Sequence, residues 1–193
     1  MTKPKLAFSP LIVEEFCKLC DWTHEVWLHH RELFDNNPRA EELNKASFTG
    51  AEFRRLAIIS QEYSILQIAK LHDPAVSFGN ITLTIDYMVT YGGWSKTVLD
   101  RLRGLQEKLD TFAKPLREAR HKILSHNDLA AIVAGNTLGA FPNGEDVKYF
   151  ETLKEFVNVV HDEVLEGTCL LFDTLVKNDV VAFLAAIKTS TSN

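Results

Sequence analysis

Apolar residues recur along most of the chain at steps of three and four, which is the spacing of an amphipathic helix. The first such stretch runs from Leu11 to Phe34 and follows Ser9-Pro10, where proline suits the first turn of a helix. The second runs from Thr49 to His72 and stops at Asp73-Pro74, because the residue before a proline is disfavoured in the α region. Both stretches predict helices.

The most regular pattern follows Gly92-Gly93. Apolar residues alternate there by steps of four and three over more than three heptads, so a long helix should pack lengthwise against other helices. This seam contains Val98, Leu102, Leu105, Leu109, Phe112, Leu116, Ala119 and Ile123. After the turn-rich stretch 134–144, we predict one helix over 145–176 and a shorter one over 179–187.

The stretch from Ile81 to Tyr91 admits two interpretations. Its apolar and polar residues alternate, as in a strand. Subsets of the same residues also form helical stripes, and a lone strand would leave its backbone groups without partners. We therefore predict a helix over 81–91 and essentially no sheet in the protein.

Composition is that of a soluble globular domain, with 46% hydrophobic and 24% charged residues. We predict one all-α domain over residues 1–193, a bundle of about five to six helices with frayed tails at 1–9 and 188–193. The net charge of −5 excludes a uniformly basic nucleic-acid binder. Because no apolar run could span a bilayer and no signal peptide is visible, we expect a cytoplasmic protein that does not contact membranes.

Cysteine and histidine give no metal pattern. Cys17-Lys-Leu-Cys20 has the spacing of a redox or zinc motif, but both thiols lie on the apolar side of the first predicted helix and no second ligand pair follows. We therefore expect them to pack in the core, and we expect no metal or other cofactor. Around Trp27, a surface or interface position is expected for His24, His29 and His30. His72 is expected to complement the dipole at a helix C-terminus.

A basic segment precedes the strongest candidate for chemistry. Residues 96–122 contain eight Lys or Arg against four Asp or Glu, and at about 100° per residue Arg117, Arg120 and His121 share one side of a helix. His126 takes the next position of the apolar seam, where it is either a hydrogen-bonded core residue or an active-site group. Arg120 and His126 would lie about 120° apart on one ideal helix. They converge only if the helix ends first or a second subunit completes the site.

Three segments resemble the abortive-infection U-type (AbiU-like) branch of the HEPN superfamily. Arg120-His-Lys-Ile-Leu-Ser-His126-Asn-Asp128 is similar to its Arg-Asn-Lys-x-x-Ala-His-x-Asp motif, with His121 and Ser125 as departures. Leu71-His-Asp73-Pro74 is similar to its Leu-x-Asp-Pro helix end. Asn80-Ile-Thr-Leu83 is similar to the Asn-Leu-Ser-Leu that opens its next helix. The resemblance covers residues 11–176.

The resemblance implies an all-α bundle that forms a homodimer, in which two Arg–His motifs share one cleft. It also implies a metal-independent endoribonuclease of toxin–antitoxin or abortive-infection (antiviral defence) type, with RNA as substrate and an antitoxin protein as a candidate partner. Arg120 and His126 would be catalytic, because guanidinium forks onto phosphate oxygens and imidazole transfers protons near neutral pH. The residues that would support them or bind RNA are Arg117, His121, Lys122, Asn127 and Asp128.

Two other interpretations stay open. The chain could be a catalytically silent HEPN module that binds RNA, a nucleotide or a protein partner, for which a dimer is again expected. It could also be a helical scaffold in which His126 is buried against a backbone carbonyl.

Overall fold

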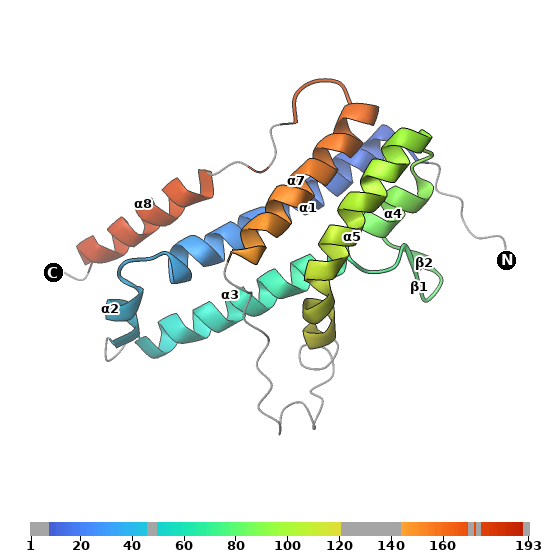
Figure 1. Ribbon diagram of the computed structural model, residues 1–193. Coiled ribbons are helices and arrows are strands. Elements are labelled where there is room, and N and C mark those ends of the chain that lie inside the picture. The colour runs from blue at the N-terminus through green and yellow to red at the C-terminus, as the bar shows by residue number, and fades with distance from the viewer. Residues whose placement is uncertain (1–7, 46–49, 121–143, 170–171, 173–174, 191–193) are drawn as a thin grey trace. The chain divides into compact units, whose positions relative to one another are not determined.

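The computed structural model describes residues 8–45, 50–120, 144–169, 172 and 175–190 (Figure 1). Regular structure in these ranges is almost entirely helical, which confirms the all-α class. The helices are α1 (Pro10–His30), the π-helical turn η1 (Arg31–Asp35), α2 (Ala40–Lys45), α3 (Gly50–Leu71), α4 (Ile85–Tyr91), α5 (Lys96–Ala119), α7 (Glu145–Val164) and α8 (Leu175–Ser190). Between α3 and α4, the strands β1 (Val76–Ser77) and β2 (Asn80–Ile81) pair antiparallel around Phe78 and Gly79, whose positive φ angles suit a two-residue turn.

Close contacts divide the chain into two compact units. The first unit is Met1–Cys20 with Ile68–Leu171, and the second is Asp21–Gln67 with Phe172–Asn193. The division falls within α1 and within α3, so each of these helices contributes residues to both units. The single domain expected from chain length stays a prediction.

The core of the first unit is built on the predicted seam of α5. Leu102, Leu105, Leu109 and Leu116 of this seam are buried, and α5 packs along α7 (Figure 1). From α1, Phe16 meets Phe156 of α7 edge to face, with ring centroids 5.9 Å apart. Cys17 and Cys20 are buried on α1, which confirms that these thiols pack in the core.

The second unit buries aromatic side chains around the C-terminal half of α1. Trp27 and Phe172 are buried, and the His24 ring lies 5.6 Å from the first and 5.0 Å from the second. The surface or interface position expected for His24 is therefore wrong, because its aromatic neighbours enclose the ring within this unit. His29 is exposed as expected, whereas the side chain of His30 is only 13% exposed.

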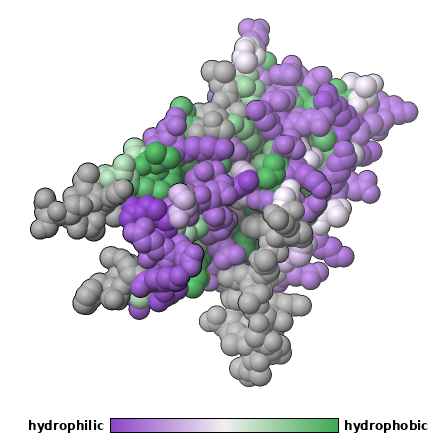
Figure 2. Space-filling model, turned by 60° about the vertical axis from the view of Figure 1, so that its left-hand side comes forward, coloured by the Kyte–Doolittle hydropathy of each residue, from purple (hydrophilic) through white to green (hydrophobic). Residues whose placement is uncertain are grey.

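Apolar residues also reach the surface in patches between hydrophilic ones (Figure 2). The exposed apolar residues of the second unit include Trp22, Leu56, Ile58, Ile59, Tyr63, Leu175, Val181 and Phe183. None of the helices in the described part of the chain is both long and apolar enough to cross a membrane.

Several helix boundaries differ from the sequence prediction. The helix expected over 81–91 begins only at Ile85, because the Thr84 hydroxyl accepts the Tyr87 N–H at 3.2 Å and caps it there. The helix expected over 145–176 ends at Val164, since Leu165 is extended and Gly167 has a φ of +97°. The last helix, α8, begins at Leu175, before the predicted start at residue 179, and it continues to Ser190, beyond the predicted end at residue 187.

One helix was not predicted at all. Residues 40–45 form α2, whose charges suit the helix dipole because Glu41 and Glu42 occupy its first turn and Lys45 its last. A helix this short shows no apolar periodicity, so the sequence pattern could not reveal it. Thr49, where the second predicted helix begins, lies outside the described residues.

Candidate functional site

Arg120 stands directly after α5 and makes an ion pair with Asp73. Its backbone N–H bonds to the carbonyls of Arg117 and Leu116, so the residue continues the helical path. Its Nη1 donates to Asp73 Oδ1 at 2.7 Å. The two side chains are 20% and 26% exposed, and they are 47 residues apart in the chain. The ion pair thus joins the first residue of the Arg–His segment to the helix end formed by the Leu-His-Asp-Pro segment.

The position of Asp73 follows from the way α3 ends. The N–H groups of His72 and Asp73 bond three residues back, to the carbonyls of Ala69 and Lys70, each at 3.2 Å. Such bonds tighten the last turn of a helix, and Pro74 cannot continue it. Asp73 is therefore presented at the tip of α3, where it meets the end of α5.

His72 is bonded on both ring nitrogens within the first unit. Its Nδ1 lies 2.7 Å from Asp110 Oδ1 of α5, and its Nε2 lies 2.9 Å from Tyr149 Oη of α7. The side chain of His72 is 0% exposed, whereas that of Asp110 is 44% exposed. The imidazole is thus a buried link between three helices, a role that its position at a helix C-terminus did not predict.

Tyr149 keeps its phenolic proton at neutral pH. Burial, followed by the nearby Cys20 and Asp110, raises the pKa of Tyr149 well above its ordinary value of 10.0. The phenol therefore stays protonated, and in the Nδ1–H tautomer of His72 it donates to Nε2 while Asp110 Oδ1 accepts from Nδ1–H. We refer to these hydrogen-bonded residues, Tyr149, His72 and Asp110, as the His72 chain.

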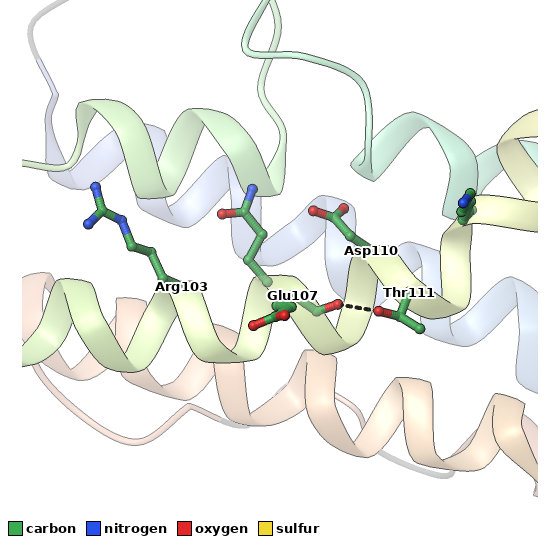
Figure 3. Close-up of a pocket in the computed structure, with 6 residues that line it drawn as sticks. Arg103, Glu107, Asp110 and Thr111 are labelled. Atoms are coloured by element: carbon green, nitrogen blue, oxygen red, sulfur yellow. Dashed lines mark hydrogen bonds between the residues drawn. The ribbon is translucent and has the colours of Figure 1, made fainter.

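Asp110 connects the His72 chain to a shallow groove on the surface of α5 (Figure 3). The groove has a volume of about 460 Å³ and is lined by Arg103, Gln106, Glu107, Asp110, Thr111 and Lys114. Figure 3 shows these side chains projecting from one helix, with the Thr111 hydroxyl bonded to the Glu107 carbonyl at 2.8 Å. Since one helix supplies every lining residue and the charges are mixed, the groove is an open surface rather than an enclosed ligand pocket.

Only part of the site predicted from the sequence can be placed. Arg120 lies at the end of α5, and Arg117 lies half-buried in the last turn of that helix. The remaining predicted residues, His121, Lys122, His126, Asn127 and Asp128, lie outside the described residues. The pairing of Arg120 with His126 therefore stays a prediction.

Other elements of the site were missed by sequence reasoning. Asp73 belongs to a recognised segment, but nothing in the sequence marked it as the partner of Arg120. Asp110 and Tyr149 carried no local signal, because they lie 38 and 77 residues from His72. In the described part of the chain, no group of three or more His, Cys, Asp or Glu side chains is arranged to hold a metal ion.

Comparison with known proteins identifies a family. A family model described as AbiU2, of the HEPN type, matches residues 11–183. No curated protein and no solved structure matches the chain. The matched range includes all three segments that resemble the family and all residues of the Asp73–Arg120 pair and the His72 chain.

Proposed function

Because the chain belongs to the AbiU2 family of HEPN proteins, we propose that it is a metal-independent endoribonuclease of toxin–antitoxin or abortive-infection type. The observation that carries the proposal is the fixed place of Arg120. This first residue of the Arg–His segment is held at the end of α5 by a 2.7 Å ion pair rather than extended into solvent. A cation in a defined position is what an enzyme needs to stabilise charge that develops on a phosphate.

Within the described part of the chain, the guanidinium of Arg120 keeps N–H donors beyond the one that bonds to Asp73. Arginine carries five N–H donors in a planar fork, and Asp73 occupies one of its nitrogens. Among the described residues, Asp73 is the one side chain that bonds to this guanidinium. The other nitrogens can therefore bind phosphate oxygens while the carboxylate holds the side chain in place.

The proposed reaction needs no metal and no co-reactant. The ribose 2′-oxygen attacks the adjacent phosphorus, its proton passes to a general base, and the bond from phosphorus to the 5′-oxygen breaks. The leaving 5′-oxygen takes up a proton, so the products are a 2′,3′-cyclic phosphate and a 5′-hydroxyl. His126 is proposed for proton transfer, because imidazole titrates near neutral pH. Arg117, His121, Lys122, Asn127 and Asp128 are proposed to bind or orient the RNA backbone.

Two chains are proposed to build the cleft together. Arg120 and His126 would lie about 120° apart on one ideal helix, so a second copy of the motif is the simplest way to bring both groups to one phosphate. An antitoxin protein that covers this cleft would hold the activity in check.

The test is RNA cleavage in EDTA by the full chain and three variants. His126→Ala should reduce cleavage by roughly 10²–10⁴-fold, the usual contribution of a general acid–base group. Arg120→Lys should also reduce cleavage, because an ammonium group cannot bind two phosphate oxygens through paired N–H groups as a guanidinium does. Arg55→Lys, in an exposed ion pair with Glu52, is the matched control and should leave cleavage unchanged.

Two results would count against the proposal. Folded His126→Ala protein that cleaves like the wild type would remove the catalytic assignment. Wild-type protein that binds RNA but leaves it intact in EDTA would favour the silent module instead.

A further inference from the structure

We propose that His72 and Asp73 are positioning residues that fix the guanidinium of Arg120. The inference rests on the proposed function and deepens it, since Arg120 is the proposed phosphate-binding group. It assigns a purpose to the His72 chain, which the proposed reaction does not otherwise use.

His72 is held in one position. Its ring has no exposed surface and is bonded at both nitrogens, to α5 on one side and to α7 on the other. Buried hydrogen bonds of this kind hold a single arrangement, because breaking either one leaves a polar group without a partner in the interior. The C-terminus of α3 is thereby tied to two helices of the first unit.

Because His72 is fixed, the next residue, Asp73, is also held in place. The N–H of Asp73 bonds to the carbonyl of Lys70, and the rigid Pro74 follows Asp73 in the chain. Beyond the proline, the Ala75 N–H donates to Asp86 Oδ2 of α4 at 2.8 Å. The backbone of Asp73 is therefore fixed on both sides, and its carboxylate has little freedom to move.

The Asp73–Arg120 ion pair is partly buried. Its side chains are 20% and 26% exposed, compared with 59% and 50% in the Arg101–Glu155 pair, which joins α5 to α7. Solvent screens a partly buried pair less than an exposed one, so Asp73 should restrain Arg120 more strongly than Glu155 restrains Arg101. The fixed position of His72 therefore holds Asp73 in place, and Asp73 in turn holds the guanidinium of Arg120.

A competing interpretation predicts the opposite effect. If Asp73 served as a resident anion that RNA must displace, removing its charge would free Arg120 and raise activity. The structure favours positioning, because Asp73 occupies one nitrogen of a guanidinium that can bind a carboxylate and a phosphate together.

The first experiment reads the position of Arg120 without any reaction. In full-length protein labelled with ¹⁵N-arginine, Arg120→Lys assigns the Arg120 signals. A guanidinium held by a carboxylate rotates slowly and gives separate Nη signals, whereas a mobile one gives averaged signals. We expect separate signals in the wild type and in Glu155→Gln, which breaks only the exposed pair, and averaged signals in Asp73→Asn and His72→Phe. Tyr149→Phe, a milder change in the His72 chain, should broaden them if His72→Phe fails to fold.

Averaged signals in the wild type, or separate signals in Asp73→Asn, would overturn the inference. Unchanged signals in folded His72→Phe or Tyr149→Phe would remove His72 from it. This readout holds even if the wild type cleaves no RNA, a result that would defeat the proposed function alone.

The second experiment measures RNA cleavage by the same variants. Asp73→Asn should lower kcat by about 10–100-fold with little change in KM, because a displaced guanidinium loses contact with the transition state. Glu155→Gln should match the wild type in both constants. A rise in kcat for Asp73→Asn would show that Asp73 competes with RNA and would overturn positioning.

Discussion

Replacing Tyr149 with phenylalanine removes one hydroxyl from the His72 chain and little else. The Tyr149 ring is 2% exposed and stacks on Phe112 at 4.7 Å, a contact that phenylalanine retains. What is lost is the 2.9 Å hydrogen bond to His72 Nε2. Because the side chain of His72 is 0% exposed, no water reaches that nitrogen in the native arrangement, and it becomes an acceptor without a donor.

The size of the effect follows from this orphaned nitrogen. Leaving a buried acceptor unsatisfied costs about 1–3 kcal/mol. For a chain of this length each kcal/mol lowers Tm by about 2–4 °C, so Tyr149→Phe should lower Tm by roughly 2–12 °C. Thermal unfolding followed by circular dichroism at fixed pH and protein concentration measures the change.

The matched control is Tyr63→Phe. That hydroxyl accepts from Trp22 Nε1 at 3.4 Å on a side chain that is 41% exposed, so its removal should change stability by no more than about 0.5 kcal/mol. Equal Tm values for Tyr149→Phe and the wild type would refute the reasoning, since they would mean that His72 does not depend on the phenol.

Two further outcomes follow from single residues. Burial is the main cause of the raised pKa of Tyr149, so the folded state keeps a proton that the unfolded state loses above pH 10.0. The stability of the wild type should therefore fall as pH rises past 10.0. Denaturant titrations should show a shallower fall for Tyr149→Phe. Gly104 lies inside α5, and no neighbouring atom lies within 4 Å of the place where an added Cβ would stand. Gly104→Ala should therefore raise the free energy of unfolding, measured by urea titration, by about 0.4–1 kcal/mol. A loss of stability would show that the backbone at this position needs glycine.

The long helices could be predicted from the sequence because their signal is local. The seam of α5 repeats every few residues, and the turn signals around Asp73-Pro74 act within one turn of the helix that they end. The single helix predicted over 145–176 is wrong, because apolar residues stay in phase on both sides of the break at Gly167. A periodic pattern shows which residues share a face, but it does not show that the backbone between them is helical.

The candidate site was predicted only in part because its contacts are distant in the chain. The resemblance marked Asp73 and Arg120 separately, yet their pairing depends on α5 ending beside the tip of α3. The His72 chain depends in addition on the packing of α5 against α7, which brings Asp110 and Tyr149 to one imidazole. Neither arrangement is encoded in spacing along one helix, so neither could be predicted from periodicity.

The ends of the RNA fragments distinguish the proposed chemistry from the alternatives in one measurement. Wild-type protein incubated with a short labelled RNA in EDTA should produce fragments that carry a 2′,3′-cyclic phosphate on one side and a 5′-hydroxyl on the other. Those ends arise only if the 2′-oxygen is the nucleophile, which is the role that Arg120 and His126 are proposed to serve. Fragments with a 3′-hydroxyl and a 5′-phosphate, or no fragments at all, would contradict the account.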